Sequence, residues 1–206
     1  LGPAWTSEEV REALDAFDGR VHATEEDDIA DRAAAEIASG RVVGWFQGRM
    51  EFGPRALGGR SILADPRDPG MKDRINDQVK RREPFRPFAP SALEEVTADW
   101  FDMTGLDISP FMLFTVPVLA DKRALIPSVT HVDGTARLQT VSRDDDPLYW
   151  RVIAQFGERT GVPVLLNTSF NVRYEPIVCS PTDALRCFLE TDIDAVALDR
   201  FWVEKR

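Results

Sequence analysis

Arginine and glycine residues are concentrated in a segment that directly follows an apolar run. Gly48 to Ser61 contains Arg49, Arg55 and Arg60 together with four glycines. Glycine allows a backbone to approach a ligand closely, and the planar guanidinium group can bind two phosphate oxygens at once. The segment lacks both the lysine–serine pair of a P-loop and the glycine spacing of a dinucleotide fingerprint. Taken alone, it is as compatible with a structural turn as with a ligand-binding loop.

Three consecutive cations, Lys80 to Arg82, precede a proline-rich stretch that contains Arg86. The dipole of a helix ending here would by itself favour cations at this position. The prolines at 84, 87 and 90, however, fix an extended chain that would hold Arg86 rigidly. A solvated helix end has no need of that rigidity, so an anion-binding segment is the second interpretation.

The segment from Thr130 to Gln139 carries the turn signal Asp133-Gly134, with His131 before it and Arg137 after it. A lone histidine is more often structural than functional. An arginine that faces inward from a strand needs an anion as its partner. In this segment, Arg137 is therefore a stronger candidate for an anion site than His131.

Short polar side chains from Asn167 to Asn171 follow the apolar run Val164–Leu166. Ligands in open α/β sheets bind at the carboxyl ends of strands, where hydroxyl and amide groups can hold phosphate or ribose oxygens. An ordinary polar turn is the alternative.

Charge is distributed unevenly along the 206 residues. The net charge is −10, yet residues 49–86 carry 10 basic and 6 acidic residues, and the flanking parts are each at −7. The overall charge argues against a general nucleic-acid binder. The basic block is either a solvated face laced with ion pairs or a local anion site within an acidic protein.

The composition, 43% hydrophobic and 29% charged, is ordinary for a soluble globular domain. No apolar run approaches the roughly 20 residues needed to span a bilayer, and no signal peptide opens the chain. Cys179 and Cys187 are too few for a disulfide framework, which fits a cytoplasmic location. The two histidines have no partners at metal-ligand spacing, so we expect no protein-held metal. A first residue of Leu1 rather than Met is typical of a fragment or a processed product.

Local signals predict alternating helices and strands, and hence an α/β domain with a twisted sheet. Residues 1–23 are expected to be an N-terminal arm or linker helix that begins with a capping box at Thr6, and residues 24–206 the main domain. Helices are predicted from Thr24 to Gly40, from Pro69 onward, over 147–160 and from Ser180 onward. Strands are predicted over 41–46, 111–118, 137–141, 163–166 and, closing the pattern, 195–198, with a loop over 48–59.

Together the four segments resemble the C-terminal domain of the NodU/CmcH-type O-carbamoyltransferases, which modify nodulation factors and antibiotics. The match runs through essentially the whole chain and is densest from Gly44 to Gly58. It continues through Phe85–Pro90, Thr130–Arg137 and Leu166–Asn171. Two positions depart from the family pattern: Gly59 stands where many relatives have asparagine, and Tyr174 where relatives usually have glycine. If position 174 needs a positive φ, tyrosine there costs about 1 kcal/mol or more.

The resemblance implies a YrdC/Sua5-like fold, a twisted mixed sheet flanked by helices. It also implies a site in which Lys80 and Arg82 form a K-x-R element and Ser169 and Asn171 an S-x-N element. Arg55 and Arg137 match family arginines that would bind phosphate, and His131 belongs to the same motif. The catalytic candidates are therefore Lys80, Arg82, Arg137 and Arg55, and the substrate- and nucleotide-binding candidates are Ser169, Asn171, His131, Asn167 and Arg86.

The resemblance further implies an ATP-dependent reaction, normally with Mg²⁺, that forms carbamoyladenylate from ATP and carbamoyl phosphate. A Kae1-like N-terminal domain, missing from this chain, would then move the carbamoyl group to an acceptor hydroxyl. Two other interpretations remain. The domain could bind ATP or RNA without turnover, or it could be a degenerate scaffold that mainly docks its partner.

Overall fold

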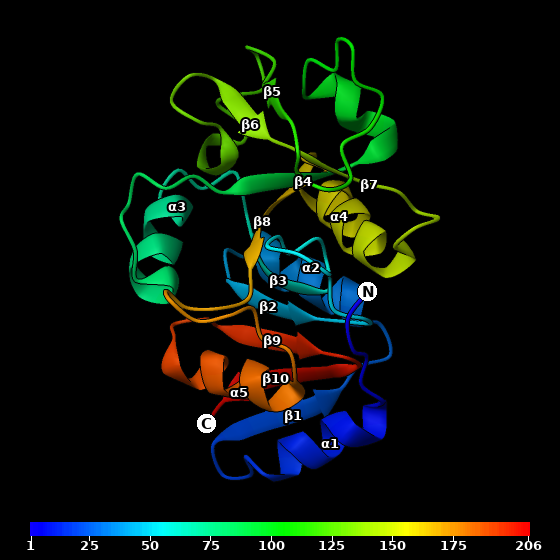
Figure 1. Cartoon of the computed structure of the whole chain (residues 1–206), viewed down its shortest axis with the longest axis vertical. Coiled ribbons are helices and arrows are strands. Elements are labelled where there is room, and N and C mark those ends of the chain that lie inside the picture. The colour runs from blue at the N-terminus through cyan, green and yellow to red at the C-terminus, as the bar shows by residue number, and fades with distance from the viewer.

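A mixed α/β fold surrounds one eight-stranded sheet in the computed structural model, which describes all residues from Leu1 to Arg206 (Figure 1). The strand order is β1-β10-β9-β2-β3-β8-β4-β7. The pairs β2–β9 and β4–β7 are parallel and the others antiparallel, which confirms the predicted fold class. The strands are β1 Val21–Glu25, β2 Val43–Phe46, β3 Arg60–Ala64, β4 Ala89–Leu93, β7 Gln139–Val141, β8 Val164–Ser169, β9 Ala195–Leu198 and β10 Phe201–Lys205.

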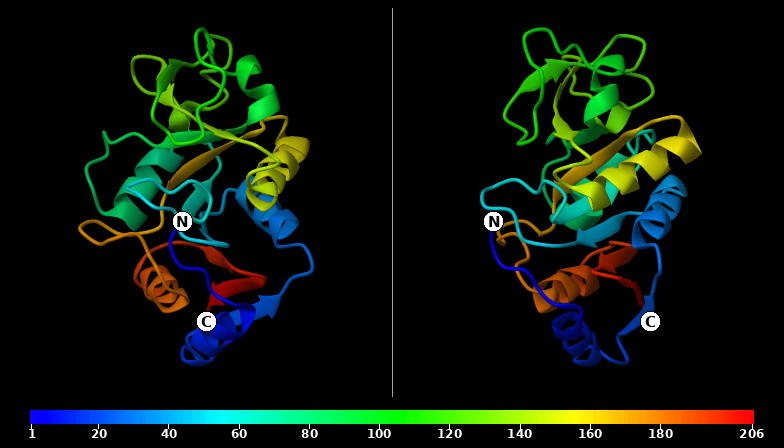
Figure 2. Two further views of the ribbon diagram at one scale, coloured as in Figure 1. Left: turned by 45° about the vertical axis from the view of Figure 1, so that its right-hand side comes forward. Right: turned by 90° about the vertical axis from the view of Figure 1, so that its right-hand side faces the viewer.

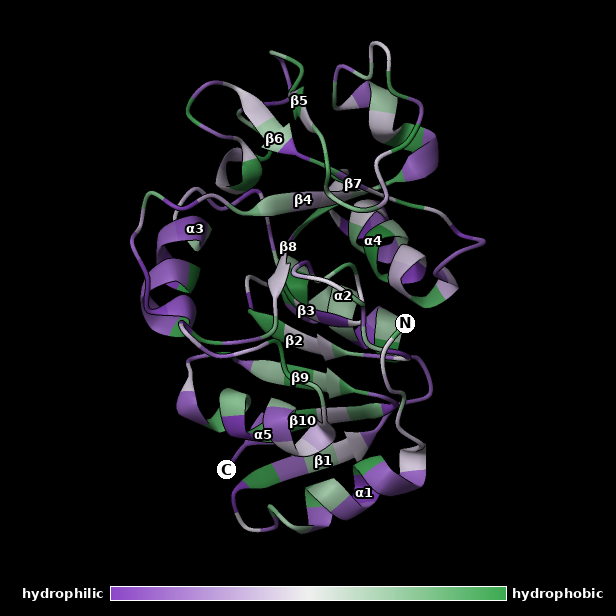
Figure 3. Ribbon diagram, viewed as in Figure 1, coloured by the Kyte–Doolittle hydropathy of each residue, from purple (hydrophilic) through white to green (hydrophobic).

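Helices cover both faces of this sheet (Figure 2). α2 (Ile29–Ala38) packs against α4 (Pro147–Thr160) on one face, and α1 (Ser7–Asp15) packs against α5 (Pro181–Glu190) on the other. Hydrophilic and hydrophobic residues alternate along α1 and α5, as expected for helices with one buried side (Figure 3). The predicted capping box at Thr6 is confirmed, and Ser180 and Asp183 form a second one at the start of α5.

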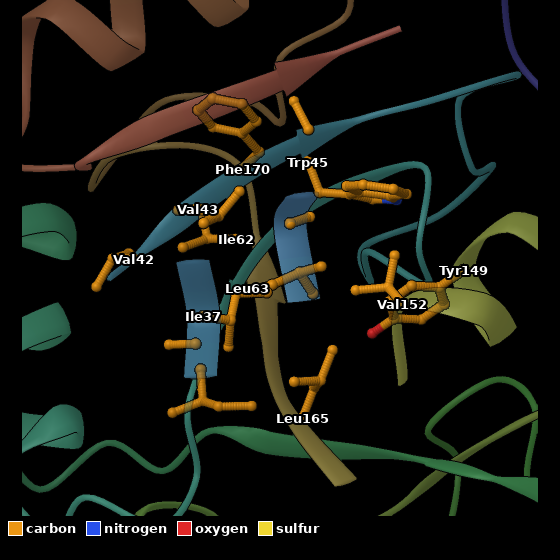
Figure 4. Packing of buried hydrophobic residues seen from close by; sticks show 14 of the residues in the cluster. Ile37, Val42, Val43, Trp45, Ile62, Leu63, Tyr149, Val152, Leu165 and Phe170 are labelled. Carbon is orange, nitrogen blue, oxygen red and sulfur yellow. The ribbon is translucent and has the colours of Figure 1, made fainter. Parts of the chain in front are cut away.

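The core lies where the central strands meet these helices. Every residue of β2, β3 and β9 is buried, since both sheet faces are covered at these strands. Ile37 of α2 and Val152 of α4 are fully buried in the same cluster (Figure 4). Phe170 follows β8 directly, and its buried ring lies beside β2. The residue that separates Ser169 from Asn171 is thus anchored in the core.

A separate two-stranded sheet lies beyond β4 and β7 (Figure 1). It pairs β5 (Thr115–Pro117) with β6 (Thr135–Arg137), and the same region contains the 3-10 helices η2 (Glu94–Asp99) and η3 (Pro127–Val129). The strand predicted over 137–141 is divided at Leu138, because Arg137 belongs to β6 and Gln139 begins β7 of the large sheet. The strand predicted over 111–118 is shorter than expected and comprises only β5.

The helix predicted to start at Thr24 is wrong at its N-terminus. Residues 21–25 form β1, which pairs with β10, and the helix starts at Ile29 after the N-cap Asp28. The Asp28 carboxylate accepts a hydrogen bond from the Asp31 backbone at 3.0 Å. The boundary expected between residues 23 and 24 therefore falls inside a strand. β3, β4 and β10 are absent from the predicted strands; each has only five residues, and these include a charged residue or a proline (Arg60, Pro90 and Glu204).

The helix predicted from Pro69 changes geometry halfway. α3 (Met71–Arg74) continues into a π-helix, η1 (Ile75–Lys80), which ends at Arg81 with φ of 49°. The expected buried side of Met71, Ile75 and Val79 is confirmed. Wide π turns occur frequently at functional sites, and this one ends with Lys80, with Arg82 two residues further along the chain.

Gly44 packs closely against the ring of Phe170, the core residue in the Ser169–Asn171 turn. A Cβ atom at Gly44 would lie 2.8 Å from the Phe170 ring, whereas one at Gly70, an exposed glycine with φ of −82°, would meet only an Asp68 side-chain oxygen at 3.3 Å. We expect Gly44→Ala to lower the free energy of unfolding by about 1–3 kcal/mol through overpacking. Gly70→Ala should be close to neutral. Urea unfolding of both variants tests this, and equal stability of the two would contradict it.

Candidate active site

A small cavity opens where β8 ends and β4 begins, because these antiparallel strands place Asn167 opposite Ala89. Its volume is about 80 Å³. Its polar walls are made by three arginines, one amide and two hydroxyl side chains, and its apolar walls by prolines, alanines, Phe88 and Met112. The lining residues are Pro54, Arg55, Ala56, Arg82, Pro87, Phe88, Ala89, Met112, Arg137, Asn167, Thr168 and Ser169. Below, this space is called the arginine cavity.

Three arginines from distant segments meet at the arginine cavity. Arg55 comes from the loop after β2, Arg82 from the residues after η1, and Arg137 from the end of β6. None of the three forms an ion pair, although 13 ion pairs occur elsewhere in the chain. The buried Nε atom of Arg137 has no hydrogen-bond partner at all. Cations left unpaired in one hollow make it a favourable place for an anion.

The electrostatics of these arginines agree with an anion site. Burial, and next the charge of Arg55, lower the pKa of Arg137. Burial lowers the pKa of Arg82 to about 10; the charges of Arg86 and Arg137 act in the same direction, and Glu83 opposes them. An anion bound in the cavity would relieve the repulsion among these like charges.

Asn76 fixes the position of Arg82. Its side-chain oxygen accepts a hydrogen bond from Arg82 Nε at 2.7 Å, and its amide nitrogen donates to the Pro84 and Arg86 carbonyls at 3.3 and 3.0 Å. The Arg82 guanidinium also lies over the Phe88 ring, 4.8 Å from its centroid. Asn76 was not among the predicted site residues. Its only signal in the sequence is a poor helix former in the middle of a helix.

Lys80 is enclosed by oxygen atoms next to the cavity. Its ammonium donates to the Ser169 carbonyl, to Ser169 Oγ at 3.2 Å, and to the carbonyl and side-chain oxygens of Asn171 at 3.1 and 2.8 Å. Ser169 Oγ in turn donates to Asn171 Oδ1 at 2.7 Å. Lys80, Ser169 and Asn171 thus form one connected group, although 89 residues or more separate the lysine from the other two.

The run of three cations is not a solvated helix end. Lys80 is only 3% exposed, Arg81 donates to the Glu190 carbonyl at 2.6 Å, and Arg82 lines the arginine cavity. Burial, and next the charge of Arg82, lower the pKa of Lys80 to about 7, and Cys187 opposes this shift.

The loop that carries Arg55 is held by a carboxylate. Glu51 Oε1 accepts hydrogen bonds from the backbone nitrogens of Leu57, Gly59 and Arg60 at 2.6, 2.7 and 3.2 Å. Gly59 fits this loop because a Cβ there would lie 2.9 Å from the Arg49 carbonyl oxygen. A residue with a Cβ atom at position 59 would require this loop to shift.

The arginines flanking Arg55 have structural partners. Fully buried Arg60 donates to the Gln47 and Gly59 carbonyls at 2.8 and 2.9 Å and covers the Phe46 ring at 3.6 Å. Arg49 donates to the Gly2 carbonyl at 2.9 Å. These two side chains stabilise the loop, and Arg55 is the one that reaches the cavity.

Of the other three predicted site residues, Asn167 lines the cavity, whereas His131 and Arg86 do not. Buried Asn167 lines the cavity, but its amide nitrogen donates to Ala56, Ser91 and Gln139. His131 is half-buried and hydrogen-bonded to Thr135 at 3.2 Å, and Arg86 is exposed and paired with Glu83 at 3.2 Å. Neither of these two lines the cavity. Burial lowers the pKa of His131, with opposing effects of Asp133 and Arg137.

The family assignment follows from the sequence comparisons. The family described as carbamoyltransferase C-terminus matches residues 34–205. The chain belongs to this family. The nodulation protein NolNO of Sinorhizobium fredii is 56% identical over 198 residues, which cover 96% of this chain and 29% of that protein. The nodulation protein NolO of Bradyrhizobium diazoefficiens is 54% identical over 207 residues, covering 100% of this chain and 38% of the relative. This carbamoyltransferase domain thus spans less than two-fifths of these relatives.

Solved structures share the fold at much lower identity. Full-length HypF, in a phosphate- and nucleotide-bound form, matches with a TM-score of 0.55 and 17% identity, over 84% of this chain and 21% of that one. HypF of T. kodakarensis matches with a TM-score of 0.56 and 16% identity, over 91% of this chain and 22% of that one. These similarities confirm the YrdC-like fold predicted from the resemblance. None of the helices combines the length and apolarity needed to cross a bilayer.

Tyr174 does adopt the positive φ that its position was suspected to require. Its φ is 67°, its side chain is 89% exposed, and its ring contacts only the Arg173 guanidinium among cations, at 4.6 Å. We expect Tyr174→Gly to be more stable than Tyr174→Ala by about 1 kcal/mol, because both remove the ring and only glycine removes the backbone strain. Thermal or urea unfolding of the two variants measures the difference. A more stable alanine variant would contradict the strain.

The lowered pKa of Lys80 predicts a dependence of stability on pH. Between about pH 7 and the ordinary lysine value of 10.5, the unfolded chain binds the proton that the folded chain has lost. The free energy of unfolding should therefore rise with pH in this window, by up to about 1.4 kcal/mol per unit. Urea unfolding at about pH 7.5 and 9.5 should show a smaller rise in Lys80→Met than in the wild type. Lys72→Met, in α3, is the control, and equal rises in all three proteins would refute a depressed pKa.

Proposed function

We propose that this domain is the adenylate-forming part of an ATP-dependent carbamoyltransferase. The observation that carries the proposal is the meeting of unpaired Arg55, Arg82 and Arg137 at one cavity, beside the group formed by Lys80, Ser169 and Asn171. Family membership supports the carbamoyl chemistry. The phosphate- and nucleotide-bound form of HypF agrees with the anions that such a fold would hold.

The proposed reaction has two steps. Water hydrolyses carbamoyl phosphate to carbamate and phosphate. A carbamate oxygen then attacks the α-phosphorus of ATP, a new P–O bond forms, the bond to the bridging oxygen of the β-phosphate breaks, and pyrophosphate leaves. The product is carbamoyladenylate. No side chain needs to act as a covalent nucleophile, so the task of the protein is to position the reactants and stabilise charge.

Each cation has a distinct part in this proposal. The guanidinium groups of Arg55, Arg82 and Arg137 would bind phosphate oxygens and stabilise the negative charge that develops on the leaving pyrophosphate. Two of them are restrained before the ligand arrives, since Asn76 holds the Arg82 side chain and Glu51 holds the loop that carries Arg55. Lys80 would keep Ser169 and Asn171 in place to orient the adenylate by hydrogen bonds.

Magnesium is proposed to enter with ATP, held mainly by phosphate oxygens and water, as is usual for this ion. The chain itself contains no group of three or more histidine, cysteine, aspartate or glutamate side chains that could hold a metal.

Transfer of the carbamoyl group is proposed to need the rest of a longer protein. The relatives are more than twice as long as the part that this chain matches. The acceptor hydroxyl would bind to a Kae1-like domain outside these 206 residues, which would receive carbamoyladenylate from this site.

The proposal predicts that Lys80→Ala and Arg137→Ala each weaken ATP binding at least about tenfold. Arg137→Ala would remove charge-assisted hydrogen bonds to phosphate, and Lys80→Ala removes the hydrogen bonds that hold Ser169 and Asn171 in place. Calorimetric titration with ATP measures this. Arg200→Ala is the matched control, because Arg200 pairs with Glu25 at the β1 end of the sheet. Unchanged affinity in both site variants would show that the site is elsewhere.

Pyrophosphate release separates the enzyme from its alternatives. With ATP and carbamoyl phosphate present, an adenylate-forming domain releases pyrophosphate. ATP binding without release would favour a nucleotide-binding domain, and absence of ATP binding in the longest protein that contains this chain would favour a docking scaffold. RNA binding would be recognised by an affinity that falls steeply with salt.

A further inference from the structure

The segment Pro110–Phe114 inserts one side chain into the arginine cavity. Met112 is 4% exposed and lines the cavity, whereas its neighbours Phe111, Leu113 and Phe114 are 59, 74 and 50% exposed. Met112 does not belong to the hydrophobic core cluster. The one buried side chain of this apolar segment therefore packs into a hollow that cations line.

Very little else holds this segment in place. It lies outside all helices and strands, and no backbone or side-chain hydrogen bond involves residues 110–114. Met112 also has a φ of 54°, a left-handed conformation that residues other than glycine rarely adopt. Segments with few hydrogen bonds and few buried contacts open locally at little cost. Within Pro110–Phe114, the burial of Met112 is the main contact with the rest of the domain.

The size of the cavity indicates which wall must move. A volume of about 80 Å³ is well below the several hundred cubic ångströms typical of small-molecule sites. Asn167 to Ser169 belong to β8, and Ala89 to β4, so those walls are fixed by sheet pairing. Methionine is unbranched and adaptable, and its segment is unpaired. Met112 is therefore the wall that can give way.

We propose that Pro110–Phe114 is a lid whose Met112 side chain occupies the arginine cavity until a phosphate-bearing ligand displaces it. Only the class of ligand rests on the proposed function. The closed lid competes with the ligand, so the apparent affinity is reduced by the fraction of molecules that are closed. Opening would also release the left-handed backbone of Met112 and free the arginines for the anion.

The first experiment measures pyrophosphate binding to the 206-residue chain by calorimetry. Met112→Gly keeps the left-handed backbone without strain and removes the side chain from the cavity, so it should bind pyrophosphate about fivefold or more tightly than the wild type. Leu113→Gly, which adds the same flexibility at an exposed neighbour, should bind like the wild type. Weaker or equal binding in Met112→Gly would show that Met112 is a fixed wall or a ligand contact, and would overturn the lid.

If pyrophosphate does not bind, that result counts against the proposed function and not against the lid. A second experiment then tests the lid without a ligand. Met112→Cys and Leu113→Cys are labelled with a maleimide, and the modified peptides are quantified by mass spectrometry. If the segment is a lid, the thiol at position 112 reacts more slowly than the thiol at position 113, because it is labelled only when the segment opens locally. The rate of this local opening, and hence of labelling, should not change in low urea. Labelling of position 112 that requires global unfolding, and so rises steeply with urea, would overturn the proposal.

Discussion

A buried ammonium group determines how the end of β8 meets the end of the π-helix. A charge removed from water must be surrounded by polar partners, and Lys80 takes all of them from Ser169 and Asn171. Ser169 and Asn171 can both accept hydrogen bonds from Lys80 because Phe170, which lies between them, is anchored in the core beside Gly44. The wide final turn of η1 brings the lysine to this point. Core packing, helix geometry and the candidate site therefore depend on one another.

The arginine cavity has the opposite character, since its charges are left without partners. Arg55, Arg82 and Arg137 make no ion pairs in a chain whose net charge is −10 and whose other arginines frequently find carboxylates. Holding like charges together costs stability, and that cost is a common property of functional sites. The hydrogen bond from Arg82 to Asn76 keeps this arginine from turning away to solvent. These features would pre-organise the cavity for the proposed anion at the expense of stability.

Sequence reasoning succeeded where structure is specified locally. The capping signals at Thr6 and Ser180 predicted helix starts correctly, because a cap depends on residues three positions apart. It failed where pairing is non-local: the helix predicted from Thr24 includes the last two residues of β1, and β10 was not predicted although it pairs with both β1 and β9. The candidate site divides similarly. Lys80, Ser169 and Asn171 were connected only through the family resemblance, whereas Asn76 and Met112 acquire their positions from tertiary contacts that no spacing in the sequence reveals.

Backbone strain gathers around the site. Four residues other than glycine have a positive φ, and three of them, Arg81, Met112 and Tyr174, adjoin the candidate groups. Arg81 separates Lys80, which contacts Ser169 and Asn171, from Arg82, which lines the arginine cavity. Met112 lines the same cavity. Tyr174 closes the turn after Asn171, whose side-chain nitrogen donates to the Glu175 carbonyl at 2.7 Å. Strain of this kind persists only where surrounding contacts enforce it, and it concentrates at ligand sites and switch regions. Its position here argues that the segments around the arginine cavity are built for a ligand, and that Met112, with no hydrogen bonds to enforce its strain, is the one most ready to move.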